Sequence, residues 1–324
     1  ARLNGETALM LAAGTGSMEA VQQLLAGGAD IEAAESAKGQ TALMWAAEGK
    51  HSKIVGFLLE QGADPNAASN GGFTALAFSA TQDDAASVRN LLAAGADPKL
   101  VLPDGTSGLM AATAFEHASA AEALIEGGAD DTPENRQGVT PLLSAVESGY
   151  VSHVKQLLAT GADPPATPGV SNAAGTRRRF GPPGLMTPLL NAANAGRIDV
   201  METLGAAGAD PLAKAQNGST LVMHAGAAAK LPVVEYAYQL DNDVTAVTDT
   251  GATVMHQIVT FTTRRSTQDE ICEVIRFLAD RGAELDPLDN RGRTPIEIAD
   301  YLPIDKAVNL LYELITTAGD TPHL

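Results

Sequence analysis

The chain has 324 residues, more than most single globular domains contain, so either two domains or an array of repeats is expected. It carries 39 acidic and 21 basic residues, and the resulting net charge of −18 argues against nucleic acid or an anionic membrane surface as the partner. Aromatic residues make up only 4% of a chain that is 45% hydrophobic. The sequence therefore predicts a core built from Ala and Leu in thin, closely packed helices.

The cysteine content, the hydrophobic segments and the N-terminal sequence exclude several further classes of protein. Cys272 is the only cysteine, which excludes an intrachain disulfide and a thiolate metal site. No segment approaches the roughly 20 apolar residues that a membrane-spanning helix needs, and ARLNGETALM lacks the basic start and apolar core of a signal peptide. Residue 1 falls within the loop before the first predicted helix. We therefore expect an upstream repeat, domain or partner to cover the first unit.

A Thr, once a Ser, followed by an apolar and Ala-rich run recurs along the whole chain. The intervals between copies are 34, 33, 33, 33, 47, 33, 33 and 41 residues. Six of the eight intervals are one period long, and the other two contain one period plus an insertion. The chain is therefore an array of internal repeats. The nine positions are Thr7, Thr41, Thr74, Ser107, Thr140, Thr187, Thr220, Thr253 and Thr294.

Each copy predicts two helices. The Thr or Ser hydroxyl is suited to cap the first turn of a helix, and Pro141, Pro188 and Pro295 occupy the first helical position. About 21 residues later a Gly-Ala-Asp triplet, or Gly-Ala-Glu at Gly282, ends a second helix with helical apolar spacing. A Gly also stands two residues before the cap in eight of the nine copies, where a left-handed turn is needed: Gly5, Gly39, Gly72, Gly105, Gly138, Gly218, Gly251 and Gly292.

With GETALMLAA, GQTALMWAAEG, GVTPLL and GATVMH, these units resemble the ankyrin repeat, whose period is 33 residues and whose first helix begins T-P-L-H-x-A. The resemblance covers the whole chain in nine copies, and His256 falls on the motif's His position. It implies an all-α solenoid of helix-turn-helix units with hairpin-like loops. The first four copies are also similar to Ala-rich ankyrin proteins of environmental bacteria, which leaves cytosol, periplasm and export open as locations.

The predicted organisation is a single ankyrin-repeat domain over residues 1–324. Two insertions interrupt the period, one within residues 164–184 and one near 261–268. The last copy carries enough charged residues to serve as a C-terminal cap. The units start near residues 5, 39, 72, 105, 138, 185, 218, 251 and 292.

Residues suited to catalysis do not converge in the sequence. The six histidines are spread over separate units, and no HExxH, CxxC, GKS, GKT or GxGxxG motif is present. His224 and His256 lie near the starts of neighbouring helices and could approach each other, although two unconnected packing histidines are favoured. We expect no enzyme activity, no metal and no cofactor.

The resemblance implies that partner-facing residues stand between the Gly and the Thr and after the Ala pair of the first helix. Exposed aromatic rings at such positions are candidate anchors, unless they fold onto the neighbouring unit. Trp45 could serve in the core, which is favoured, or in the groove. The candidates chosen from these positions are Glu48, Phe73, Phe115, Glu147, Met186 and Phe261.

The insertions are basic on an acidic chain. The first carries Arg177, Arg178, Arg179 and Phe180, and the second carries Arg264 and Arg265. These charges could dock an acidic patch of a partner, fold back on the chain's own carboxylates, or belong to solvated loops. Their separation on two loops of an acidic chain argues against a nucleic-acid site.

Three functions remain open at this point. The favoured one is a protein-protein interaction module that binds a partner through its concave groove and loops. The second is a structural scaffold or accessory subunit of a larger assembly, working through the chain's ends and the long loop. The third is a repeat domain appended to an enzyme or cofactor-binding protein. Because a fold does not imply a function, neither the partner nor its host follows from the repeat.

Overall fold

The computed structural model describes residues 5–129, 135, 139–164, 186–261 and 266–318, and the part it describes contains eighteen helices and no strand. The prediction of an all-α repeat fold is thus confirmed. The chain divides into two units, Ala1–Ala162 and Asp163–Leu324, each described below by itself. None of the helices in the described ranges is long and apolar enough to cross a lipid bilayer.

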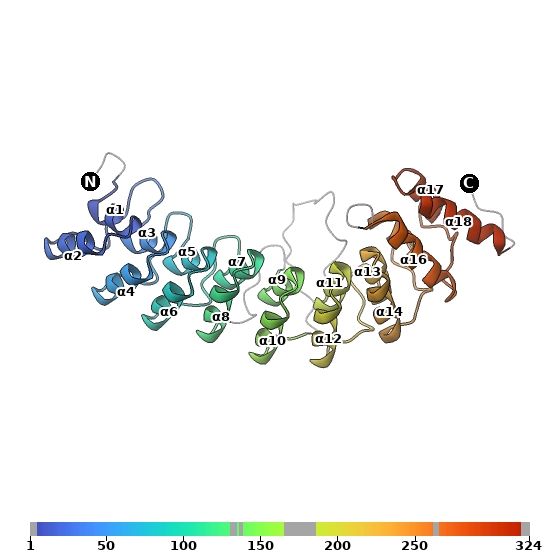
Figure 1. Ribbon diagram of the computed structural model, residues 1–324, viewed down its shortest axis with the longest axis horizontal. Coiled ribbons are helices and arrows are strands. Elements are labelled where there is room, and N and C mark those ends of the chain that lie inside the picture. Colours follow the sequence, from blue (N-terminus) through green and yellow to red (C-terminus); the bar gives the residue numbers. More distant parts are fainter. Residues whose placement is uncertain (1–4, 130–134, 136–138, 165–185, 262–265, 319–324) are drawn as a thin grey trace. The chain divides into compact units, whose positions relative to one another are not determined.

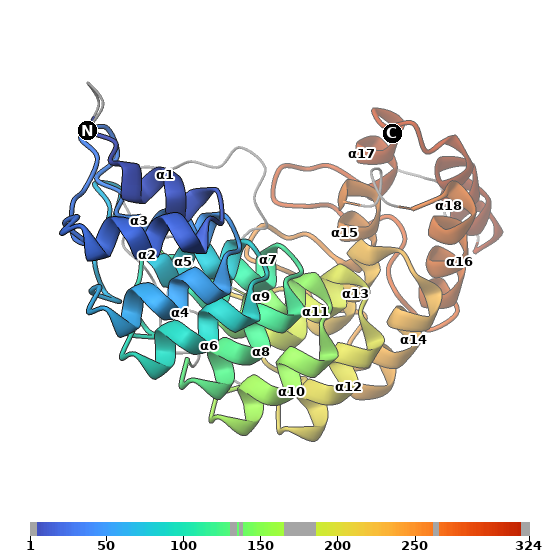
Figure 2. The same cartoon turned by 60° about the vertical axis from the view of Figure 1, so that its left-hand side comes forward.

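The first unit consists of five helix pairs, which we call repeats one to five. The first helix of each pair is the inner helix and the second is the outer helix. Inner helices contact the next inner helix and outer helices the next outer helix, so the unit has two layers (Figures 1 and 2). The pairs are α1 (Ala8–Gly14) and α2 (Met18–Ala26), α3 (Ala42–Glu48) and α4 (Ser52–Glu60), α5 (Ala75–Thr81) and α6 (Ala85–Ala93), α7 (Gly108–Ala114) and α8 (Ala118–Glu126), and α9 (Pro141–Ser148) and α10 (Val151–Ala159).

The second unit consists of four pairs, repeats six to nine, with the same alternation of inner and outer helices. Its last two outer helices, with 12 and 13 residues, are the longest described. The pairs are α11 (Pro188–Ala195) and α12 (Ile198–Ala206), α13 (Leu221–Ala228) and α14 (Leu231–Leu240), α15 (Val254–Phe261) and α16 (Gln268–Ala279), and α17 (Pro295–Asp300) and α18 (Asp305–Thr317).

Every inner helix begins directly after the recurring Thr or Ser. In six repeats this hydroxyl accepts a hydrogen bond from a backbone N–H in the first turn, as Thr140 does from Leu143. Thr41 and Thr220 occupy the same place without such a bond. Pro141, Pro188 and Pro295 start their helices, where a missing N–H costs nothing because it would have no partner within the helix.

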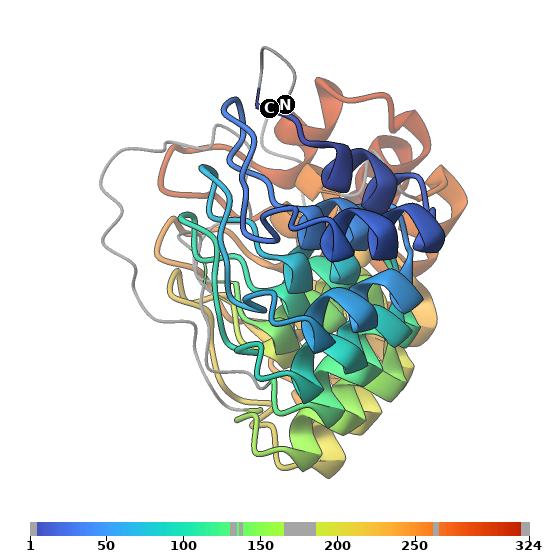
Figure 3. The same cartoon turned by 90° about the vertical axis from the view of Figure 1, so that its left-hand side faces the viewer.

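The loops are held by glycines in the left-handed region. The glycine two residues before the cap has a φ between 70° and 87° in all seven repeats where it is described. At Gly251 a Cβ would lie 2.8 Å from the backbone nitrogen of Asn290, which donates to the carbonyl of Thr250 in the preceding loop. In the first unit a Cβ at Gly39 would likewise lie 3.0 Å from the backbone nitrogen of Asn70, so the loops there run side by side, as Figure 3 shows, at a spacing that favours glycine.

Polar side chains connect one repeat to the next across the layers. His51 and His117 directly precede outer helices α4 and α8 and contact the carbonyl oxygens of Gly14 and Ala80 in the preceding repeat, each at 3.1 Å. The carboxylate of Asp83 accepts from the backbone N–H of Ala120 in the following repeat at 2.9 Å. These bonds satisfy backbone groups at helix ends and set the spacing of the stack.

The core consists of small and aliphatic side chains, as the composition predicts. Ala13, Ala47 and Ala80 are fully buried at equivalent positions of the first three inner helices, and Leu58, Leu91 and Leu124 are fully buried on the outer helices. Alanine keeps neighbouring helices close, so no large ring is needed to fill the space between them.

We expect Gly251→Ala to lower the free energy of unfolding more than Gly282→Ala. Both residues have a φ above 70°, which costs an L-residue about 1–2 kcal/mol, but only at Gly251 does the new Cβ also meet backbone atoms. At Gly282 no atom lies within 4 Å of the new Cβ. Urea denaturation followed by helical circular dichroism measures both; equal losses would contradict the role assigned to close loop contact.

Candidate functional site

Two exposed aromatic rings mark neighbouring repeats of the first unit. Phe73 directly precedes the cap of α5 and is 37% exposed, and Phe115 directly follows α7 and is 62% exposed. Their closest ring partners belong to the same repeat, Phe78 at 5.6 Å and His117 at 5.8 Å between centroids. Each ring therefore rests on its own repeat and leaves a face open, so both predicted positions have the geometry of an anchor.

Glu48 and Glu147 lie at the ends of inner helices α3 and α9, and both are exposed. They belong to repeats two and five, on either side of the repeats that carry Phe73 and Phe115. In the first unit the sequence-predicted positions thus supply aromatic rings in the middle and carboxylates on the flanking repeats. We call the exposed residues of this set, Glu48, Phe73, Phe115 and Glu147, the binding face, after the role that the sequence predicts for them.

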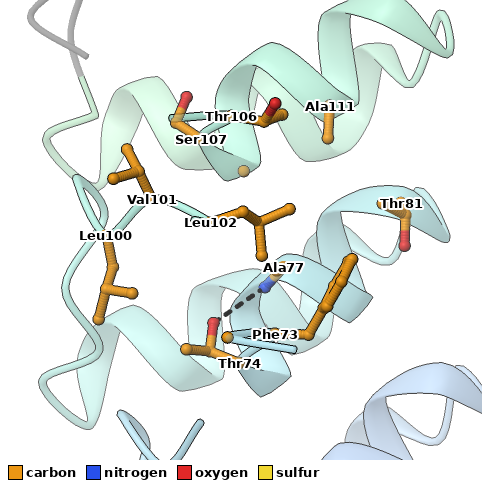
Figure 4. Close-up of a pocket in the computed structure, with 12 residues that line it drawn as sticks. Phe73, Thr74, Ala77, Thr81, Leu100, Val101, Leu102, Thr106, Ser107 and Ala111 are labelled. Atoms are coloured by element: carbon orange, nitrogen blue, oxygen red, sulfur yellow. Dashed lines mark hydrogen bonds between the residues drawn. The ribbon is translucent and has the colours of Figure 1, made fainter. Parts of the chain in front are cut away.

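A small pocket lies between α5 and α7 beside Phe73. Figure 4 shows the ring of Phe73 standing along α5 below Thr81, with Leu102 reaching from the loop into the space between the two helices. Ala77 and Ala111 contribute only methyl groups, and the cavity volume is about 20 Å³. The lining is mostly apolar, with hydroxyl groups of Thr74, Thr81, Thr106 and Ser107 at its edges.

In the second unit the prediction for Met186 is wrong. Its side chain is 7% exposed and lies directly before the cap of α11, and residues 187–193 after it are all buried. Phe261, at the end of α15, is 46% exposed and thus accessible as predicted. Arg177, Arg178, Arg179, Phe180, Arg264 and Arg265 lie outside the described residues, and their role stays a prediction.

Trp45, for which core and groove roles were open, is half-buried. Its ring lies against Gly14 of the preceding repeat, so close that a Cβ at Gly14 would come within 2.9 Å of the Trp45 ring. The ring therefore covers the end of the preceding inner helix and contributes to packing between repeats.

Tyr301 is the most exposed large hydrophobic side chain in the described part of the chain, at 88%. It borders a pocket of about 490 Å³ formed with Thr260, Arg293, Glu297, Ile298, Asp300 and Leu302. Arg293 is held at this pocket by Asp289, whose carboxylate accepts from two guanidinium nitrogens at 2.7 and 3.1 Å. Burial alone would raise the pKa of Asp289, but backbone and guanidinium hydrogen bonds from Arg293 hold it at about 2.

Sequence reasoning missed exposed apolar side chains that recur in the loops of both units. Val101, Val247 and Leu288 each lie six residues before a cap residue, at the same place in the repeat. The repeat register contained this signal. A surface Val or Leu, however, is not distinguished from a core residue by its type alone.

His224 and His256 are buried and make separate hydrogen bonds, so the favoured interpretation of two unconnected histidines describes them. His224 Nε2 lies 2.8 Å from Ser219 Oγ, and Ser219 in turn donates to Asn217 Oδ1 at 2.7 Å. His256 pairs with Thr253 and with the carbonyl of Arg293 in the next repeat. Among the described residues no group of three His, Cys, Asp or Glu side chains is placed to hold a metal ion.

The family model for ankyrin repeats in three copies matches residues 1–69 and 71–167. The ankyrin repeat and SAM domain-containing protein 6 of Rattus norvegicus, like that of Mus musculus, is 44% identical over 71 residues, which is 22% of this chain. The match spans 8% of the length of these curated relatives.

A solved structure, the ankyrin repeat domain of Bcl-3, a member of the IkappaB protein family, aligns with a TM-score of 0.58 and 26% identity. The alignment covers 72% of this chain and 98% of the Bcl-3 chain.

We expect His224→Gln to flatten the acid dependence of stability. Burial lowers the pKa of His224 to about 4, from an ordinary value near 6.5, so its contribution is present above pH 6.5 and is lost as the pH falls toward 4. Gln keeps a polar group near Ser219 but does not titrate in this range. The parent should lose roughly 2–3 kcal/mol more than the variant between pH 7.5 and 4.5.

Urea denaturation of both proteins at the two pH values measures this difference. Carboxylates titrate in parent and variant alike, so the difference between the two isolates the histidine. If parent and variant lose the same free energy of unfolding between the two pH values, His224 is not held neutral by the fold.

Proposed function

Because the chain belongs to the ankyrin-repeat family, whose repeats bind protein partners, we propose that it is a non-catalytic protein-binding module. The binding face of the first unit is the surface that we assign to the partner. The second unit adds Phe261 and Tyr301, each exposed at the end of an inner helix.

The observation that carries this proposal is the exposure of Phe73 and Phe115 on adjacent repeats. Large rings that are already held against their own repeat lose little side-chain freedom on binding, and their open faces remove apolar area from water in a complex. Interface energy concentrates in such residues, while surrounding polar residues exclude water. Glu48 and Glu147, exposed on the flanking repeats, supply that polar surround in this proposal.

The position of these residues in the repeat supports the same surface. They lie immediately before or at the end of an inner helix, and unlike Gln40 and Met186 at positions equivalent to Phe73, they are not covered by the stack. The positions used for stacking, such as Ala80 and Ala112, are fully buried and occupied by alanine. Side chains outside the stacking positions can vary with the partner without loss of the fold.

We expect Phe73→Ala and Phe115→Ala each to weaken partner binding by roughly ten-fold or more, because hot-spot truncations cost about 2 kcal/mol. The probe is a random 16-residue peptide library displayed on phage and selected against the immobilised full chain. Enriched peptides are then synthesised, and their dissociation constants are measured for parent and variants by fluorescence polarisation.

Leu212→Ala is the matched control, because Leu212 is equally apolar and exposed but lies in a loop of the second unit. It should leave binding unchanged, and circular dichroism should show that all three variants are folded. The proposal would be contradicted if no peptide is enriched, or if neither Phe substitution changes the dissociation constants. Concentration-dependent self-association in the same preparation would favour the scaffold function.

A further inference from the structure

The pocket beside Phe73 exists because two positions that hold large side chains in other repeats hold alanine here. Three residues after the cap, Ala77 stands where repeats one, two and four have Met10, Met44 and Met110. Four residues after the cap, Ala111 stands where repeats one to three have Leu11, Trp45 and Phe78. Both alanines are half-buried and line the pocket.

A side chain four residues after the cap leans toward the preceding repeat, as the contact of Trp45 with Gly14 shows. At Ala111 the corresponding space above α5 is therefore left open. It is bordered by Phe73, Thr81 and Leu102, as Figure 4 shows. We call this space, lined by Phe73, Ala77, Thr81, Val101, Leu102 and Ala111, the recess.

The recess joins the binding face. Phe73 forms one of its walls, and Phe115 lies four residues after Ala111, a separation that places two residues on the same face of a helix. A segment seated across Phe115 is thereby positioned to place one side chain in the recess. The cavity volume of about 20 Å³ has room for a methyl-sized group, so an aliphatic side chain can insert its end there whereas a full ring cannot enter.

The charge around the recess indicates which charge a bound partner segment should carry. Repeats three and four, over residues 69–129, contain seven acidic residues and two basic ones. Of the two basic residues, Arg89 lies on an outer helix and is paired with Glu126 at 3.4 Å. Asp83 and Glu116, which follow the two inner helices, are exposed. A cationic segment is attracted to this surface, whereas an acidic one is repelled.

We propose that the recess takes the side chain of one leucine from a partner-protein segment in which Lys or Arg residues flank that leucine. This inference rests on the proposed binding function and assigns it a specificity pocket. The leucine inserts the end of its side chain into the space that Trp45 covers at the equivalent position between repeats one and two. The flanking cations face the carboxylates on both sides.

The test uses the full chain and fluorescein-labelled nine-residue peptides in fluorescence polarisation. One peptide is Gly-Ser-Lys-Lys-Leu-Lys-Lys-Ser-Gly; the second has Ala in place of Leu, and the third has Glu in place of every Lys. We expect the Leu peptide to bind roughly ten-fold more tightly than the Ala peptide, because only the former buries an aliphatic side chain. The Glu peptide should bind more weakly than either.

Ala111→Leu and Ala77→Met fill the recess with side chains that other repeats carry at the same positions, so both variants should fold. Each should reduce affinity for the Leu peptide to the level of the Ala peptide. Ala86→Leu adds the same volume at an exposed position of outer helix α6 and should change nothing. Circular dichroism and urea denaturation confirm that the variants are folded.

The outcomes separate this inference from the proposed function. If Leu and Ala peptides bind the parent equally, or none binds at about 1 mM, the recess is not a leucine pocket. If Phe115→Ala weakens the Leu peptide while Ala111→Leu does not, the binding face stands and the recess is overturned. If both Ala111→Leu and Ala77→Met lose affinity for the Leu peptide alone, and Ala86→Leu does not, the result supports the recess as the leucine site.

Discussion

The structure depends on one constraint: a pair of short helices cannot bury its own apolar face and must bury it against the next pair. The inner helices of the first unit have seven or eight residues, too few to be stable alone in water. Fully buried alanines such as Ala80 and Ala112 let successive inner helices approach closely. Stability in each unit therefore comes from contacts between neighbours, and each repeat depends on the ones beside it.

The same constraint sets the chemistry of the loops. Closely spaced helix pairs require closely spaced loops, and glycines with positive φ, such as Gly39 and Gly251, leave no side chain where the next loop passes. Backbone bonds from one loop to the next then join the repeats, as between Asn70 and Lys38 at 2.7 Å. His51 and His117 add contacts to carbonyls at helix ends. Packing and polar pairing thus repeat with the same period.

Function becomes available where a side chain is not needed for stacking. Phe73 and Phe115 lie at helix boundaries, keep contacts within their own repeats and still expose ring surface. The recess arises in the opposite way, by loss of volume at Ala77 and Ala111 within an otherwise conservative pattern of Met, Leu and aromatic residues. The exposed rings and the recess left by the two alanines together give the first unit a surface that identical repeats would not have.

The sequence by itself determined the repeat period, the two helices of each copy, their caps and their Gly stops, because these depend on contacts within a few residues. It also identified Phe73, Phe115 and Phe261 as positions that the structure leaves exposed. It did not distinguish Met186, which is buried, from these, because position in the repeat does not say which neighbours cover a side chain. Only the tertiary structure decided that, and only it showed the recess, whose walls come from two helices and a loop of adjacent repeats.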